Sequence, residues 1–132
     1  MYKALILIAL WMGVVLVSQA QSIRIGTFNV SMEASNYLPK NHQPTGAELF
    51  ERLASGQHQQ IRNIAEIIQR VRPDIILLNE FDYTGDDAQG VRAFIKNYLA
   101  FSQHGADPID YPYHYTAPVN TGVPSGIDLN HD

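Results

Sequence analysis

The sequence predicts an α/β fold, and three segments of the 132-residue chain carry that prediction. Residues 22–30 are strand-like, residues 57–72 have helical spacing, and residues 75–78 form a continuous apolar run. A strand, a helix and a buried strand in this order are typical of a right-handed crossover between parallel strands. We therefore expect the two strands to be parallel neighbours in one sheet.

The N-terminus has the layout of a secretory signal peptide. Lys3 is followed by an apolar run over residues 4–17, and a small-residue pattern then ends at Ala20, after which cleavage is expected. A run of 14 apolar residues falls short of the roughly 20 that a helix needs to cross a bilayer. We expect residues 1–20 to be removed, residues 21–132 to form part of one domain without a membrane anchor, and the protein to be secreted or periplasmic.

The first strand, residues 22–30, is predicted by alternation, since Ile23 and Ile25 are each followed by a residue that is not a large apolar one. The next stretch, residues 31–45, is polar and contains several Asn and Pro residues, which predicts a loop. A short helix is expected over residues 47–54.

The main helix is predicted over residues 57–72 and must end before Pro73. Its apolar residues recur at steps of three and four and so share one helical face: Ile61, Ile64, Ala65, Ile68 and Val71. The apolar run that follows at residues 75–78 shows no alternation. This is typical of a short strand covered on both faces.

Two further elements are predicted in the last third of the chain. A helix is expected over residues 88–101, because its apolar residues repeat at helical spacing and Asp86 or Asp87 can cap it. Residues 111–119 are rich in Tyr and interrupted by two prolines. Proline cannot donate to an interior ladder, so this segment could be an edge strand.

Composition disfavours several classes of function. The net charge is −4 and no cluster of Lys and Arg is present, so tight binding to duplex DNA is not expected. The chain has no cysteine, which excludes disulfides and thiolate metal sites. None of the five histidines pairs with another at the spacing of a helical zinc site.

Asn29 and Glu80 are the candidate site residues, because each stands where a predicted strand leaves the core. In open α/β sheets ligands bind beyond the carboxyl ends of the strands, so parallel strands would bring these side chains together. Amide and carboxylate oxygens are hard donors that suit Mg²⁺, Mn²⁺ or Ca²⁺. Spacing alone also allows an exposed glutamate and a turn-forming asparagine without a metal.

Two segments carry a family resemblance: Ile-Gly-Thr-Phe-Asn-Val at residues 25–30 and Arg-Pro-Asp-Ile-Ile-Leu-Leu-Asn-Glu at residues 72–80. Together they resemble the first two signature blocks of the endonuclease/exonuclease/phosphatase superfamily. The resemblance implies that Asn29 lies in the active site near metal and phosphate, and that Glu80 binds the metal directly. Asn79 stands where many members have Gln, so an amide hydrogen bond could persist with a shorter reach.

The resemblance also implies a fold and an activity. The family is a four-layered α/β sandwich with two mixed sheets between helices, of which this chain would supply the N-terminal part. The implied activity is that of a secreted phosphoesterase, of phosphodiesterase, phosphatase or nuclease type, which uses Mg²⁺ or Mn²⁺ on a phosphoester substrate.

The family's later blocks, Gly-Asp-x-Asn and Ser-Asp-His, supply the water-orienting residues and the catalytic His, and neither is present in residues 84–132. We therefore expect these 132 residues to be inactive alone. The alternative is a non-catalytic exported module that keeps the same scaffold for binding or interaction.

One further pattern lies near the end of the sequence. Asp128, Asn130 and Asp132 alternate like the first three ligands of a calcium loop. So short a match is more typical of a polar turn.

Overall fold

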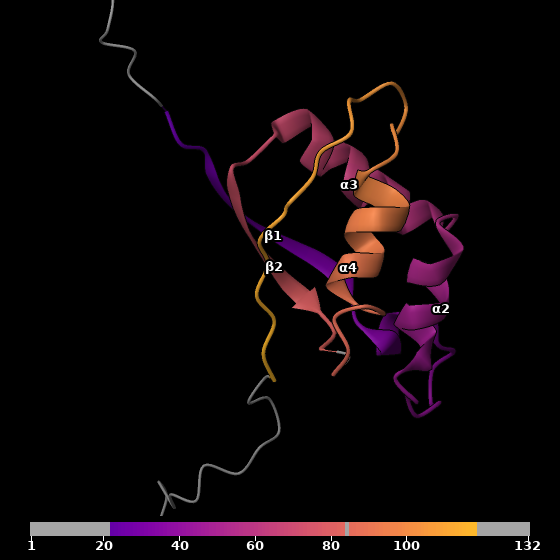
Figure 1. The fold of residues 1–132 in the computed structure, drawn as a ribbon. Coiled ribbons are helices and arrows are strands. Elements are labelled where there is room, and N and C mark those ends of the chain that lie inside the picture. The colour runs from indigo at the N-terminus through magenta and orange to yellow at the C-terminus, as the bar shows by residue number, and fades with distance from the viewer. Residues whose placement is uncertain (1–21, 84, 119–132) are drawn as a thin grey trace, which may run out of the picture.

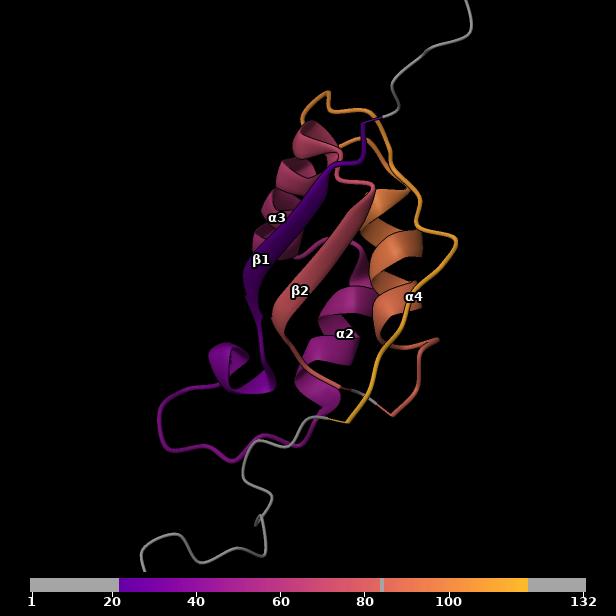
Figure 2. The same cartoon turned by 90° about the vertical axis from the view of Figure 1, so that its left-hand side faces the viewer.

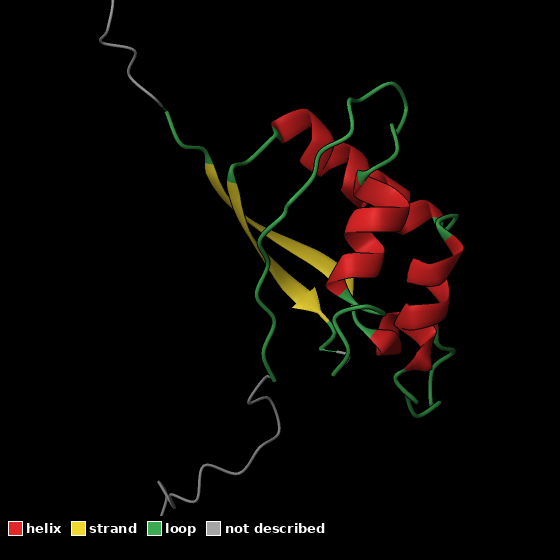
Figure 3. Ribbon diagram, viewed as in Figure 1, coloured by secondary structure: helices red, strands yellow, loops and turns green. Residues whose placement is uncertain are grey.

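The structure, a computed structural model, describes residues 22–83 and 85–118 as two strands and five helical segments (Figures 1 and 3). In chain order these are β1 (Ile25–Met32), the 3₁₀-helix η1 (Ala34–Tyr37), α2 (Ala47–Ser55), α3 (Gln59–Val71), β2 (Ile75–Phe81), α4 (Val91–Phe94) and the π-helical turn η2 (Ile95–Leu99). The predicted α/β class is confirmed.

Strands β1 and β2 are parallel neighbours, as predicted, and α2 and α3 lie between them in the chain. The register runs without interruption from Ile25 opposite Ile75 to Asn29 opposite Asn79. Both strands continue beyond their predicted ends, β1 to Met32 and β2 to Phe81. The residues that follow the motifs therefore belong to the sheet.

The helices cover one face of the sheet, and Figure 2 looks onto the opposite face. Even-numbered residues of β1 turn toward the helices, so that Val30 and Met32 are 2% and 0% exposed. These two side chains join apolar residues of the helices in one core: Leu49, Leu53, Ile61, Ile64, Ala65, Ile68, Ala93, Phe94, Tyr98 and Leu99. The core therefore lies between the sheet and the helices.

The prediction that β2 is covered on both faces is wrong for the described residues. Odd-numbered residues point away from the helices, and Ile25, Ile75 and Leu77 are 72%, 56% and 62% exposed. The apolar run was correctly placed in a strand, but only its even-numbered residues face helices. We call the surface formed by Ile25, Ile75 and Leu77 the open sheet face.

Helices α2 and α3 form nearly where the sequence predicts them, and both end at residues in the left-handed conformation. Gly56 follows α2 with φ +62°, and a Cβ atom there would stand 3.2 Å from the carbonyl oxygen of Asn97. Glycine therefore permits both the sharp turn and the close approach of η2. Arg72 ends α3 with φ 50°, immediately before Pro73.

The helix predicted over residues 88–101 begins later, at Val91, and its second half is a π-helix. Asp86 does act as a cap, but of a preceding turn, since its Oδ1 accepts the Ala88 N–H at 2.8 Å. Gly90 follows with φ −95° and ψ −112°, outside the helical region. The turn and this glycine postpone the start of the helix.

The predicted edge strand at residues 111–119 is not formed over residues 111–118, and Val119 lies outside the described residues. Side-chain hydrogen bonds attach this segment to the rest of the fold, in place of the backbone hydrogen bonds of a strand. The Tyr111 hydroxyl donates to the Pro73 carbonyl at 2.8 Å, and the Thr116 hydroxyl donates to Asp87 at 2.6 Å. Its two prolines remove the donors that an edge strand would use.

Two predictions fall outside the described residues, namely the signal peptide at residues 1–20 and the pattern at Asp128, Asn130 and Asp132. Within residues 22–83 and 85–118, none of the helices combines the length and the apolar character that crossing a membrane requires.

Candidate functional site

A β-bulge lies where the two sequence motifs end. Asn29 pairs with Asn79 and Met32 pairs with Phe81, so two residues of β1 face the single residue Glu80 of β2. An extra residue in one strand bends the ladder and re-aims the side chains beside it, and such bulges are common next to active sites.

Glu80 turns out of the regular strand at this bulge. Its φ is +55°, a left-handed value that is uncommon for a residue with a side chain. Regular alternation would aim Glu80 toward the helices with Ile76 and Leu78, which are partly buried, but Glu80 is exposed. The backbone therefore delivers the carboxylate to the same side of the sheet as Asn29.

Ser31 connects the two predicted site residues. Its backbone N–H donates to Asn29 Oδ1 at 3.0 Å, and its hydroxyl donates to Glu80 Oε2 at 3.2 Å. The same hydroxyl lies 3.4 Å from Asn29 Oδ1. The structure thus brings Asn29 and Glu80 together around one serine, at the end of the sheet that the sequence predicted.

Three residues that the sequence analysis missed support the chain around Ser31. The Ser31 carbonyl accepts hydrogen bonds from Asn36 Nδ2 at 3.1 Å and from Gln60 Nε2 at 3.0 Å. Asp82 accepts the Ala34 N–H at 2.6 Å and so caps η1. Asp82 follows β2 directly, a position that could have singled it out, whereas no sequence signal marks Asn36 or Gln60.

Asn79 does form an amide hydrogen bond, as the sequence allowed for this residue in place of the glutamine of many family members. Its Nδ2 donates to the hydroxyl of Thr27 at 2.9 Å, across the sheet from the second motif to the first. Both residues are exposed on the open side of the sheet. The bond fixes the two strands relative to each other one step before the bulge.

The model of the Endonuclease/Exonuclease/phosphatase family matches residues 26–127, which include all of β1 except its first residue, the bulge, β2 and all the helical segments of the described residues. The chain belongs to the endonuclease/exonuclease/phosphatase family. No curated protein and no solved structure matches the chain. The family places the chain among phosphoesterases and nucleases, and its members generally depend on a divalent metal.

The donors at the bulge fit a hard cation of the kind this family uses. Glu80 is exposed and forms no ion pair with any Lys or Arg of the described residues. Asn29 Oδ1 keeps a second lone pair beside the one that Ser31 uses. No group of three His, Cys, Asp or Glu side chains suited to a metal occurs in residues 22–83 and 85–118. The described residues therefore offer a carboxylate and an amide oxygen.

The carboxylates that do have cationic partners lie elsewhere. Glu66 on α3 accepts from Arg70 Nε at 2.7 Å and contacts His104 Nδ1 at 2.5 Å. The hydrogen bond from His104, and then that from Arg70, lowers the pKa of Glu66. This cluster joins α3 to the turn after η2 and contains neither predicted site residue.

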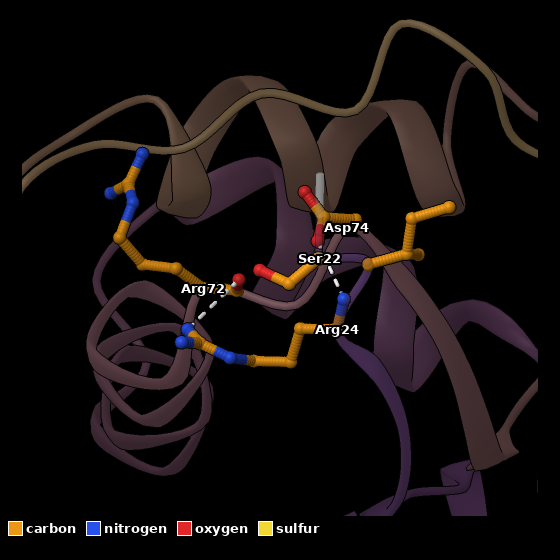
Figure 4. A pocket seen from close by; sticks show the side chains of 5 residues that line it. Ser22, Arg24, Arg72 and Asp74 are labelled. Carbon is orange, nitrogen blue, oxygen red and sulfur yellow. Dashed lines mark hydrogen bonds between the residues drawn. The ribbon is translucent and has the colours of Figure 1, made fainter. Parts of the chain in front are cut away.

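The hollow at the opposite end of the sheet is a structural junction. There the Arg24 N–H donates to the Asp74 carboxylate at 2.7 Å, and the Arg24 guanidinium donates to the Arg72 carbonyl (Figure 4). The guanidinium also donates to the carbonyl of Val71, the last residue of α3. A cation at the last carbonyls of a helix stabilises them. These bonds hold β1, the end of α3 and the start of β2 together.

Proposed function

We propose that the full-length protein is an exported, divalent-metal-dependent hydrolase of phosphoester bonds. Glu80 binds the metal directly, and Asn29 lies beside it, close to the metal and the phosphate. The single observation that carries this proposal is the left-handed turn at Glu80 (φ +55°), which removes a carboxylate from the core-facing side of β2 and sets it next to Asn29.

The metal we propose is Mg²⁺ or Mn²⁺. Ca²⁺ is a further hard cation that these oxygen ligands suit. Small hard cations keep several waters and use only one or two carboxylates together with substrate phosphates. A site with one carboxylate and one amide oxygen suits that behaviour. When bound, the cation polarises a phosphoryl oxygen. Glu80 holds the cation, and Asn29 lies beside the cation and the phosphate. The water-orienting residues and the catalytic base come from the family's later blocks.

The substrate we propose is a small or extracellular phosphoester. The net charge of −4 disfavours attraction to a polyanion, since non-specific nucleic acid binding depends on clustered Lys and Arg. Export rests on the signal-like residues 1–20 and remains part of the proposal.

The architecture we propose for the whole protein is the four-layered sandwich of this family, with two mixed sheets between helices. Support comes from the open sheet face, where Ile25, Ile75 and Leu77 are all more than half exposed. Two packed sheets bury apolar residues of this kind between them. Helices already cover the other face of the sheet (Figure 2).

Titration of Mn²⁺ and Mg²⁺ into the full-length protein tests the metal role of Glu80. Glu80→Ala should lower metal affinity at least ten-fold, because the variant loses the one charged side chain that we propose binds the cation. Phosphodiesterase activity should fall in parallel. Calorimetry measures the affinity, and hydrolysis of a chromogenic phosphodiester measures the activity.

Glu51→Ala is the matched control, since Glu51 is an exposed glutamate on α2 and lies outside the bulge. It should leave affinity and activity unchanged. Equal affinity and equal activity in wild type and Glu80→Ala would remove Glu80 from the site, whereas a wild-type protein without phosphodiesterase activity would favour the non-catalytic exported module.

A further inference from the structure

Ser31 has a backbone conformation that its own side chain disfavours. Its φ is +48°, a value that glycine adopts freely and serine does not. Left-handed residues with side chains persist only where their surroundings over-determine them, and they cluster at functional sites. Two such residues, Ser31 and Glu80, face each other here across one bulge.

The surroundings of Ser31 do over-determine it. Its N–H is held by Asn29, and its carbonyl accepts two side-chain amides, from Asn36 and Gln60. These partners come from β1, η1 and α3, so three separate elements fix one residue. Only the hydroxyl is left to act on another group.

The Ser31 hydroxyl has one proton and two acceptors within reach. Glu80 Oε2 is the nearer at 3.2 Å, and Asn29 Oδ1 lies at 3.4 Å. The Ser31 side chain is exposed, so it contributes nothing to the apolar core. Its contacts are with the two residues that form the proposed metal site.

We propose that Ser31 is a positioning residue whose hydroxyl holds the Glu80 carboxylate beside the Asn29 amide. This inference rests on the proposed function, because it assigns Ser31 to the same site. A hydrogen bond to one carboxylate oxygen restricts the rotation of Glu80 and leaves its other oxygen for the cation. Partners of this kind orient metal ligands, and their loss commonly weakens metal binding by roughly ten- to a hundred-fold.

The experiment compares Mn²⁺ affinity and thermal stability of the full-length protein for wild type, Ser31→Ala, Ser31→Gly and Glu80→Gln. Ser31→Ala removes the hydroxyl and keeps a side chain in the left-handed conformation. Ser31→Gly removes the hydroxyl and also relieves the backbone. Ser35→Ala is the matched control, since this exposed serine of η1 has a hydroxyl that forms no hydrogen bond within the described residues.

Both Ser31 variants should bind Mn²⁺ roughly ten-fold more weakly than wild type, at the lower end of the effect of removing such a partner. Ser31→Gly should nevertheless unfold at a higher temperature than Ser31→Ala, because glycine fits φ +48° without strain. The ¹³Cδ resonance of Glu80 in the metal-free protein should shift in both Ser31 variants. Ser35→Ala should match wild type in all three measurements.

Wild-type affinity in both Ser31 variants, together with weak binding by Glu80→Gln, would overturn the positioning role and leave the proposed metal site intact. Wild-type affinity in Ser31→Gly alone would also overturn it, because the backbone and not the hydroxyl would then matter. Wild-type affinity in Glu80→Gln would instead remove the proposed function, and the positioning role with it.

Discussion

Glu48, at the start of α2, is a single residue whose titration should be visible in the stability of the protein. Its carboxylate accepts the backbone N–H of Thr45 at 3.0 Å, the Thr45 hydroxyl at 2.8 Å and the Gly46 N–H at 2.9 Å. These bonds, with that from the Thr45 N–H the largest, lower the pKa of Glu48 from 4.5 to about 2. The carboxylate thus reaches back to the N–H groups of the two residues before α2, as the glutamate of a capping box does, and fixes the turn that leads into the helix.

Acid should therefore destabilise the protein between pH 4.5 and about 2. Because the folded pKa of Glu48 lies below the unfolded one, its contribution is complete above pH 4.5 and is lost as pH falls toward about 2. Thermal midpoints measured across this range should fall for wild type and fall less for Glu48→Gln.

The matched control for this pH series is Glu51→Gln, on the same helix and exposed, which should keep the wild-type pH dependence. Glu66 and Asp86 also have lowered pKa values, held down chiefly by hydrogen bonds from the side chains of His104 and Gln89, so a smaller slope should remain in Glu48→Gln. Identical slopes in wild type and Glu48→Gln would contradict the role of the cap.

At the scale of residues, the sequence could predict that Asn29 and Glu80 lie at the same end of the sheet, because each stands at or near the end of its motif and the two strands run parallel. It could not predict Ser31. The contact depends on the sign of two φ angles and on a bulge, neither of which follows from residue type. Serine and glutamate are not residues that prefer a left-handed conformation.

Among the elements, one buried amide contributes to the contact of α3 with η2 and the chain after it. Gln69 is 1% exposed, and its Nε2 donates to the carbonyls of Leu99 and Phe101 at 2.9 and 2.7 Å. Its Oε1 accepts the Gln103 N–H at 3.1 Å. A buried polar group left without a partner costs roughly 1–3 kcal/mol.

Gln69→Ala should accordingly lower the free energy of unfolding by about 2 kcal/mol, because it leaves the buried Gln103 N–H without an acceptor. Chemical denaturation measures the change. Gln59→Ala, on the exposed first turn of the same helix, should change it by less than about 0.5 kcal/mol. Equal losses in the two variants would show that the buried network contributes nothing specific.

The elements that the sequence predicted well are those with long and regular patterns. Helix α3 has five apolar residues on one face, and its end is set by Pro73. The prediction failed where one local feature dominates. Gly90 delays the start of α4, and side-chain anchors replace the expected ladder in residues 111–118.

For the whole molecule, the open sheet face is the main liability. Ile25, Ile75 and Leu77 expose 72%, 56% and 62% of their surface side by side on two paired strands. Both outer edges of the two-stranded sheet formed by the described residues are also unpaired. Exposed apolar strands with free edges pair with other chains.

Residues 21–132 on their own should therefore self-associate or have a low thermal unfolding midpoint. Leu77→Gln should reduce association, since it replaces an exposed apolar side chain of the open sheet face with a polar one. Sedimentation velocity over a range of concentrations measures the change. Ile67→Gln is the matched control, because Ile67 is 47% exposed on α3. A wild-type monomer with cooperative thermal unfolding would contradict this prediction.

The parallel pairing of β1 with β2 has a consequence for the order in which the protein can be made. Arg24 and Asp74, which meet at the start of the sheet, are 50 residues apart in the chain. A nascent β1 therefore leaves the ribosome well before its partner has been synthesised, and closing so long a loop carries an entropic cost that local helices do not have. During that interval α2 and α3 can form and begin to cover Val30 and Met32, while the edge of β1 that later pairs with β2 still lacks its hydrogen-bond partners.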